Sequence, residues 1–441
     1  MSHRFLGRWS GVGLVVANMI GAGVMLSAGF MAQEMSAGPI LLAWVLGLTI
    51  ALLGARTYGA IAAISGESGG EYRYLSDYLH PVFGYLAGWG SLLMGFSAPI
   101  AVDAIAVGAF ANTFYAGPDP RILGTAVVIG LTLAHALSLS GSKWTQNVLV
   151  LVKIVLVFGF VVLGLVVGRW SWPTWKPPVE STGFPVLAFF MQQFWIAFAF
   201  SGWNAAIYVA SEFRNPKKDV PFAMLVGTLG VGALYLVVNW IFVANLTPEL
   251  ATAVFSYEET RITLAHAVMG NLIGPIGGQL TSGLILLAFI SAMSAMILVG
   301  PRVYAAMAKD GYLPKVFAGR DGKPPVGSVL LQGGLAIVML WTHSILQAVQ
   351  GAAMVLMLFT GLTALTLFAI RFRRDLPNPP MNVLVTAGLF ALIQVGLIGF
   401  GVAYSKLLFW ELFGFLAFGL VAYGLTELTR HLRRDRDGGQ T

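Results

Sequence analysis

Long apolar segments separated by short polar ones recur along the whole chain of 441 residues. Each is about as long as the roughly 20 residues that a helix needs to cross the hydrocarbon core of a bilayer. The pattern therefore predicts an all-α membrane protein with about 12 transmembrane helices. The expected spans are residues 11–33, 39–64, 83–115, 122–140, 146–168, 184–211, 220–245, 275–300, 326–343, 347–370, 382–403 and 406–429.

The first apolar segment is interrupted near its middle. Gly21 and Gly23 lie within residues 18–25, and glycine costs about 1 kcal/mol relative to alanine inside a helix. Backbone groups freed in the bilayer need partners, so a break there is expected to line a cavity. The two half-helices would turn a positive N-terminus and a negative C-terminus toward it, which suits a zwitterion such as an amino acid. The alternative is that these small residues only allow two helices to pack closely.

A second interruption, residues 198–204, lies inside the apolar segment 184–212. Two broken segments in corresponding places of two halves are the best sequence indication of a transporter site. With both termini on one side, spans 1–5 and 6–10 have opposite orientations, which predicts a 5+5 inverted repeat plus two extra helices. The expected units are 1–170 (first repeat), 184–375 (second repeat), 381–430 (the last two spans) and 431–441 (a cytoplasmic tail).

Composition and charge support a membrane protein. Hydrophobic residues make up 57% of the chain and charged residues 10%, which is membrane composition. The net charge of +7 is interpreted as a topology signal rather than as a nucleic-acid site. Roughly 20 of the 26 Lys and Arg residues fall on one side of the membrane, as the positive-inside rule requires. We therefore expect both termini in the cytoplasm and a multi-pass location in the cytoplasmic (inner) membrane.

Several chemistries are excluded by what the sequence lacks. The chain has no cysteine, so it has no disulfide-linked subunit, thiolate metal site or thiol catalysis. No Gly-rich phosphate loop appears, so ATP is not the expected energy source. Because no nucleophile–base pair or metal-ligand cluster is evident either, we expect no enzyme activity, no metal and no cofactor.

Several motifs, occurring in a fixed order, carry a family resemblance. They are residues 21–24 (GAGV), 65–74 (SGESGGEYRY), 200–206 (FSGWNAA), 212–221 (EFRNPKKDVP) and 302–314. Together they resemble the amino acid–polyamine–organocation transporters over about residues 10–375. The resemblance implies the 5+5 inverted-repeat fold and alternating access to a site in the middle of the membrane.

The resemblance also implies where a substrate would bind. Its carboxylate site falls on the backbone of Gly21, Ala22 and Gly23, and its amino-group site on carbonyls near Met19, Phe198 and Ser201. Ala22 stands where many members have serine, so one hydroxyl contact to the carboxylate is missing.

Side chains around this site bear on the substrate class. Phe198 is expected to cover the substrate, and Gly202 and Asn204 complete the second interruption; Asn204 either hydrogen bonds at the pocket or packs. Met296 stands where an arginine-handling relative has tryptophan. A thioether suits apolar side chains better than a guanidinium, which prefers aromatic faces, so neutral substrates are favoured over cationic ones.

Two ionisable residues, Lys153 and Asp103, lie within apolar segments, and an intramembrane charge is a functional hypothesis by default. The resemblance implies that the Lys153 ammonium takes the place of a sodium ion between the first and eighth helices, beside Ser291 and Ser294. It would also be able to release a proton during the cycle. The alternative for Lys153 is that it reaches the cytoplasmic surface. For Asp103 the alternatives are a role with a substrate cation or a proton, and pairing with another helix.

Three other polar groups have simpler expected roles. His135 is interpreted as a helix–helix contact. The acids of the cytoplasmic loop 66–72, Glu67 and Glu71, are expected to be solvated, with a gating ion pair as the alternative.

The sequence thus predicts sodium-independent secondary transport of amino acids, neutral ones foremost, by proton symport or exchange. The alternatives are transport of cationic amino acids or polyamines, and an amino acid sensor that does not transport. The expected partners are the amino acid substrate and the lipid bilayer, with the protein a monomer or homodimer and no nucleic acid bound.

Overall fold

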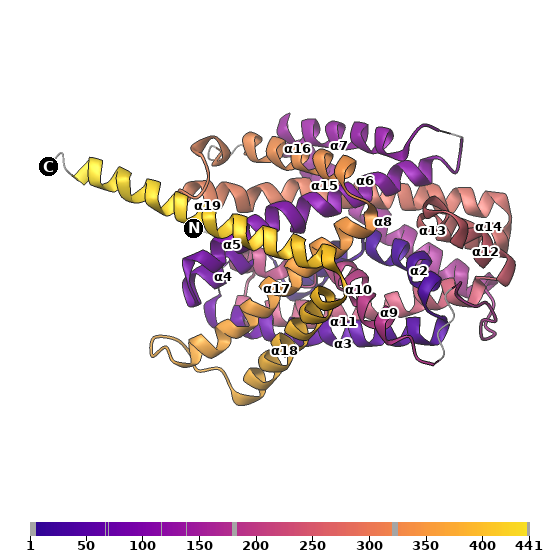
Figure 1. Ribbon diagram of the computed structural model, residues 1–441, viewed down its shortest axis with the longest axis horizontal. Coiled ribbons are helices and arrows are strands. Elements are labelled where there is room, and N and C mark those ends of the chain that lie inside the picture. The colour runs from indigo at the N-terminus through magenta and orange to yellow at the C-terminus, as the bar shows by residue number, and fades with distance from the viewer. Residues whose placement is uncertain are drawn as a thin grey trace.

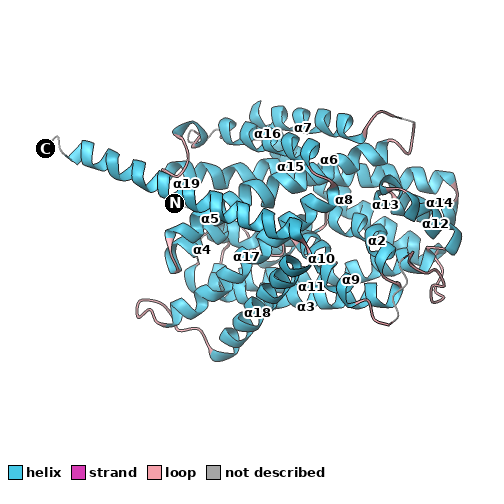
Figure 2. Cartoon of the chain, viewed as in Figure 1, coloured by secondary structure: helices cyan, strands magenta, loops and turns pink. Residues whose placement is uncertain are grey.

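The computed structural model describes residues 6–66, 68, 70–115, 117–137, 139–178, 183–319 and 325–438. In these residues every regular element is a helix (Figure 2), apart from an isolated bridge between Leu6 and Phe213. The first half of the chain contains α1 (Arg8–Met19), α2 (Ala22–Glu34), α3 (Ala37–Ser65), α4 (Gly70–Tyr78), α5 (Pro81–Gly90), the π-helix η1 (Ser91–Ser97), α6 (Ala98–Ala111), α7 (Pro120–Leu137) and α8 (Leu139–Val167).

The second half contains thirteen further helices in the described residues. They are α9 (Val186–Met191), α10 (Gln193–Phe200), the 3-10 helix η2 (Ala205–Glu212), α11 (Pro216–Asn245), α12 (Pro248–Ser256), α13 (Glu258–Ile262), α14 (Leu264–Ile273), α15 (Pro275–Lys309), the 3-10 helix η3 (Lys315–Phe317), α16 (Val326–Thr342), α17 (Ile345–Arg371), α18 (Met381–Tyr404) and α19 (Lys406–Gly438).

Nine helices of the described chain are long and apolar enough to cross a membrane, and ten if the bent pair α1–α2 counts as one span. The protein is therefore an all-helical, multi-pass membrane protein. α16 and the part of α8 from Leu151 to Val167 are apolar but shorter. Most long helices run along the longest axis of the molecule; α4, α5 and the projecting end of α19 lie at one end, and α12, α13 and α14 at the other (Figure 1).

Local sequence signals fix several helix ends. Gly66 ends α3 in the left-handed conformation, with φ of 66°, which glycine adopts without the steric cost of a Cβ. Ser344 and Gln347 form a capping box at the start of α17. Pro216 begins α11, at a position where proline removes no helical hydrogen bond.

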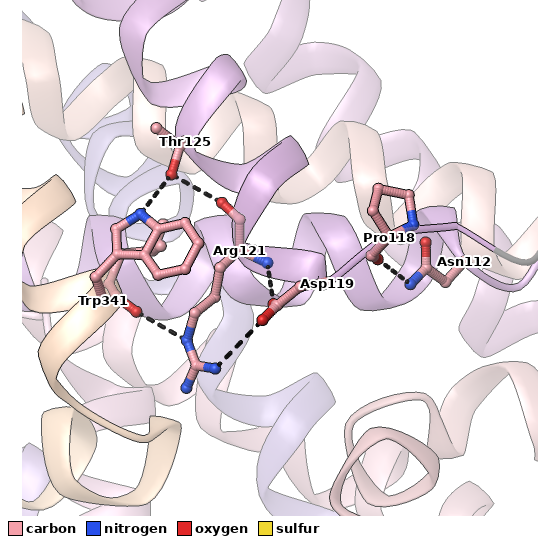
Figure 3. A network of polar contacts seen from close by, with 7 residues as sticks. Asn112, Pro118, Asp119, Arg121, Thr125 and Trp341 are labelled. Carbon is pink, nitrogen blue, oxygen red and sulfur yellow. Dashed lines mark hydrogen bonds and ion pairs between the residues drawn. The ribbon is translucent and has the colours of Figure 1, made fainter.

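A polar network ties α7 to the end of α16 (Figure 3). Arg121 Nε donates to the carbonyl of Leu340 over 3.0 Å, and Trp341 Nε1 donates to Thr125 Oγ1 over 3.0 Å. Asp119 Oδ1 accepts from the Arg121 amide at 2.9 Å. Because these bonds join segments more than 200 residues apart, they hold two otherwise separate helices in register.

Candidate functional site

Both predicted interruptions are real gaps between helices. Break one, residues 20–21, separates α1 from α2, whose axes differ by 43°. Break two, residues 201–204, separates α10 from η2. Gly202 in break two has φ of 97°, a conformation that favours glycine, whereas Gly21 is extended with φ of −148°.

The two breaks touch each other through glycines. A Cβ added to Gly23 would lie 2.4 Å from the Cα of Ala199, and one added to Gly202 would lie 2.9 Å from the backbone carbon of Asn18. Both distances are shorter than real Cβ contacts. Two glycines therefore bring the backbones of the two breaks into direct contact, and the predicted positions 19–23 and 198–204 come together.

Tyr235 of α11 bonds both breaks, and sequence reasoning missed it. Its hydroxyl lies 2.5 Å from the carbonyl oxygen of Met19 and 3.1 Å from that of Ala199. These carbonyls belong to the last turns of α1 and α10, where helices leave acceptors unsatisfied. Tyr235 is only 1% exposed, and a buried tyrosine hydroxyl usually needs a partner; because burial is a property of the fold, no signal in the sequence singles out this residue.

Lys153 of α8 is 2% exposed, and its ammonium donates to the carbonyl oxygen of Ala17 in α1 over 2.7 Å. It does not reach the surface, so the snorkelling alternative is wrong. Asp103 of α6 is also 2% exposed. Among the described residues, no ion pair within 4.0 Å joins the two side chains.

The two serines of α15 have different environments. Ser294 Oγ lies 2.9 Å from Nε2 of His135 in α7, so His135 is the helix–helix contact that was expected. Ser291 is fully buried, and its hydroxyl has no hydrogen-bond partner in the described residues. Neither serine bonds Lys153 directly.

Two cavities lie beside the breaks. The larger offers about 70 Å³ to the centres of water molecules, enough for several waters. Ser201, Gly202 and Asn204 line it, together with residues of α3, α10, α17 and α18. Its side chains include Thr360, which accepts a bond from Gln394 Nε2 over 3.3 Å.

The smaller cavity offers about 20 Å³. Its lining includes Gly21 of break one, Lys153 of α8 and Ala288 of α15. Two predicted site residues, Phe198 and Met296, line neither of these cavities. Phe198 is 5% exposed. The carbonyl of Met296 accepts a hydrogen bond from Gln332 Nε2 over 3.0 Å.

The first turn of α4 contradicts one expectation. Glu71 is 6% exposed rather than solvated. Its carboxylate accepts hydrogen bonds from Tyr58, Asn204 and Tyr208. A carboxylate can enter the protein interior when donors satisfy it, and here three neutral side chains do so. Glu67 lies outside the described residues.

Comparison with known proteins identifies relatives over most of the chain. A family model described as "Amino acid permease" matches residues 6–420. The b(0,+)-type amino acid transporter 1 of Mus musculus is 26% identical over 455 aligned residues, covering 97% of this chain and 91% of the relative. The Large neutral amino acids transporter small subunit 2 of Homo sapiens is 24% identical, covering 85% of this chain and 71% of the relative.

Proposed function

Because the chain belongs to the amino acid permease family, we propose that it carries amino acids, neutral ones foremost, across the cytoplasmic membrane without sodium. The family and the relatives are transporters, so the protein is a transporter and not an enzyme. The observation that carries the proposal is the meeting of two broken helices at Gly23 and Gly202. Such a meeting is typical of transporter substrate sites.

In this proposal the substrate backbone lies between the breaks. The amides of Gly21, Ala22 and Gly23 begin α2 and hold the carboxylate, since a helix N-terminus attracts an anion. Carbonyls of Met19, Phe198 and Ser201 receive the ammonium group. Phe198 covers the substrate from α10, and Gly202, Asn204 and Met296 complete the site.

Lys153 replaces a sodium ion in the proposed cycle. Its bond to Ala17 gives the inner half of the first broken helix a fixed cation, which complements the negative end of that helix. In the proposal Ser291 and Ser294 flank it on α15 during the cycle. An ammonium at this place removes the need for a bound sodium ion.

Met296 favours neutral substrates over cationic ones, because a thioether suits apolar side chains better than a guanidinium. Asp103 lines neither of the two cavities beside the breaks, so neither cavity presents this carboxylate to a substrate cation. The rival, transport of cationic amino acids or polyamines, instead requires Asp103 to bind the substrate cation. A non-transporting sensor is the second rival.

The proposed topology has both termini in the cytoplasm. It consists of 12 spans in a 5+5 inverted repeat: residues 1–170, 184–375, and the two added helices within 381–430. Residues 431–441 form a cytoplasmic tail. In this topology α4 and the C-terminal end of α15 lie on the cytoplasmic side of the membrane.

The decisive test is uptake of radiolabelled leucine and other amino acids into proteoliposomes, without sodium, with the proton gradient present or clamped. Uptake that follows the inward proton gradient identifies a symporter, and uptake that needs internal amino acid identifies an exchanger. Uptake only with sodium contradicts the role of Lys153. Competition by arginine or putrescine, lost in Asp103→Asn, favours the cationic rival, and binding without uptake favours the sensor.

A further inference from the structure

The buried carboxylate of Glu71 joins α4 to two other elements. Glu71 Oε1 lies 3.2 Å from the Tyr58 hydroxyl of α3 and 2.6 Å from Asn204 Nδ2 at the end of break two. Glu71 Oε2 accepts from the Tyr208 hydroxyl of η2. Hydrogen bonds to an ionised group are about twice as strong as neutral ones, so this cluster is a strong polar link between α4 and the broken helix.

The contacts continue along one side of η2. Ser68 and Ser211 lie 2.8 Å apart through their hydroxyl oxygens, and the Ser211 amide donates to Ser68 Oγ over 2.9 Å. A Cβ added to Gly70 would meet the Tyr208 ring at 2.2 Å, so the start of α4 is pressed against that ring. Asn204, Tyr208 and Ser211 therefore all contact the segment from Ser68 to Glu71.

Tyr72, the residue after Glu71, bonds α4 to the C-terminal end of α15. The hydroxyl of Tyr72 donates to Asp310 Oδ2 over 2.6 Å, just beyond the end of α15. Burial and this bond raise the pKa of Tyr72 well above its usual value, so the hydroxyl remains a donor at neutral pH. Arg373, beyond α17, donates to the carbonyl of Asp77 over 2.9 Å. Consecutive residues on a helix point about 100° apart, which lets Glu71 and Tyr72 bond different partners.

We propose that α4 is a latch that holds η2, the second half of the broken helix 186–212, against α15 and α17, and that Glu71 is its positioning residue. Opening the end of the protein that contains α4 requires η2 either to release Glu71 or to pull α4 from Asp310. The inference rests on the proposed function, in that alternating access gives this opening a purpose.

The test uses the absence of native cysteine. Ala210 in η2 is fully buried, so Ala210→Cys supplies a single thiol that reacts with a membrane-impermeant maleimide when η2 separates. Labelling is measured in vesicles with the α4 side outward. Glu71→Gln keeps the side-chain volume but removes the charge, and it should raise the labelling rate about tenfold, the shift expected from losing one charge-assisted bond. Unchanged labelling overturns the proposal.

Two further variants and a control complete the design. Tyr208→Phe removes one donor and should raise labelling by a smaller factor, and it replaces Glu71→Gln if that variant does not fold. Tyr72→Phe frees α4 from Asp310 and should also raise labelling. Glu258→Gln changes an exposed carboxylate of α13, at the other end of the molecule, and should leave labelling at the parent rate. An equal rise in Glu258→Gln would mean that any loss of charge has this effect, and would overturn the latch.

The labelling result is independent of the transport assay. If the parent protein takes up no amino acid but Glu71→Gln still raises labelling, the latch stands and the proposed function fails. If uptake is normal and labelling does not respond to any of the three variants, the proposed function stands and the latch fails.

Discussion

The two breaks differ in backbone conformation and are held by opposite charges. At break one the C-terminal turn of α1 receives the Lys153 ammonium on Ala17. At break two the N-terminal end of η2 follows Asn204, which donates to the Glu71 carboxylate. A helix carries a partial negative charge at its C-terminus and a partial positive charge at its N-terminus. Each buried ion therefore lies at the helix end that it complements.

This comparison explains which helix ends remain for a substrate. The other two ends at the breaks are the N-terminus of α2 and the C-terminus of α10, and no charged side chain in the described residues is hydrogen bonded to them. A zwitterion supplies a carboxylate for the first and an ammonium for the second. The protein thus provides ions for two of the four ends, and the proposed substrate provides ions for the others.

The largest effect should come from a methyl group at the contact between the breaks. Gly202→Ala places a Cβ 2.9 Å from the backbone of Asn18 at φ of 97°, which costs on the order of 1–3 kcal/mol in backbone strain alone. We expect transport to be lost and thermal stability to fall. Gly21→Ala is the matched control, since its Cβ would meet nothing closer than 3.9 Å. Equal loss in both variants would contradict the distinction between the two breaks.

Removal of the cation at break one should have the second-largest effect on transport. Lys153→Gln keeps a donor but loses the charge, and hydrogen bonds to charged groups contribute about 1.5–3 kcal/mol. We expect kcat for leucine exchange or uptake to fall at least about tenfold when sodium is absent. The control is the exposed Lys406→Gln. Restoration of Lys153→Gln activity by sodium would support the substitution of the ammonium for an ion.

Tyr235→Phe tests the group shared by both breaks. The variant removes a hydroxyl between two carbonyls while it keeps the ring against Trp44 and Phe200. We expect a loss of about 1 kcal/mol, seen as a several-fold rise in KM, with the protein still folded. A rise in KM on one face of the membrane only would show that the hydroxyl serves one break more than the other.

Asp103→Asn should have the smallest effect on neutral substrates. The amide has nearly the same shape, and Asp103 makes no ion pair within 4.0 Å of Lys153, so we expect the leucine KM to change by less than about threefold. Leucine and arginine uptake are measured side by side. Selective loss of arginine uptake would contradict the proposed neutral preference.

Sequence reasoning located the breaks because an interruption of an apolar run is a local signal. Lys153 was identified for the same reason, as a charge within such a run. Glu71 was expected to be solvated because the sequence around it is polar and Gly-rich, which predicts a loop, whereas it lies in the first turn of α4. Its three donors are 13, 133 and 137 residues away, and no local pattern contains them. Tyr235 resembles any core tyrosine in sequence, since its acceptors are 216 and 36 residues away.

The position of Tyr235 has a consequence for the movement of the two half-helices. A phenol has one proton, yet two carbonyls from separate half-helices lie within its reach, which makes this arrangement a three-centre bond. When either half-helix moves away, the hydroxyl can donate wholly to the carbonyl that stays. Separation of the half-helices therefore does not leave this buried hydroxyl without an acceptor.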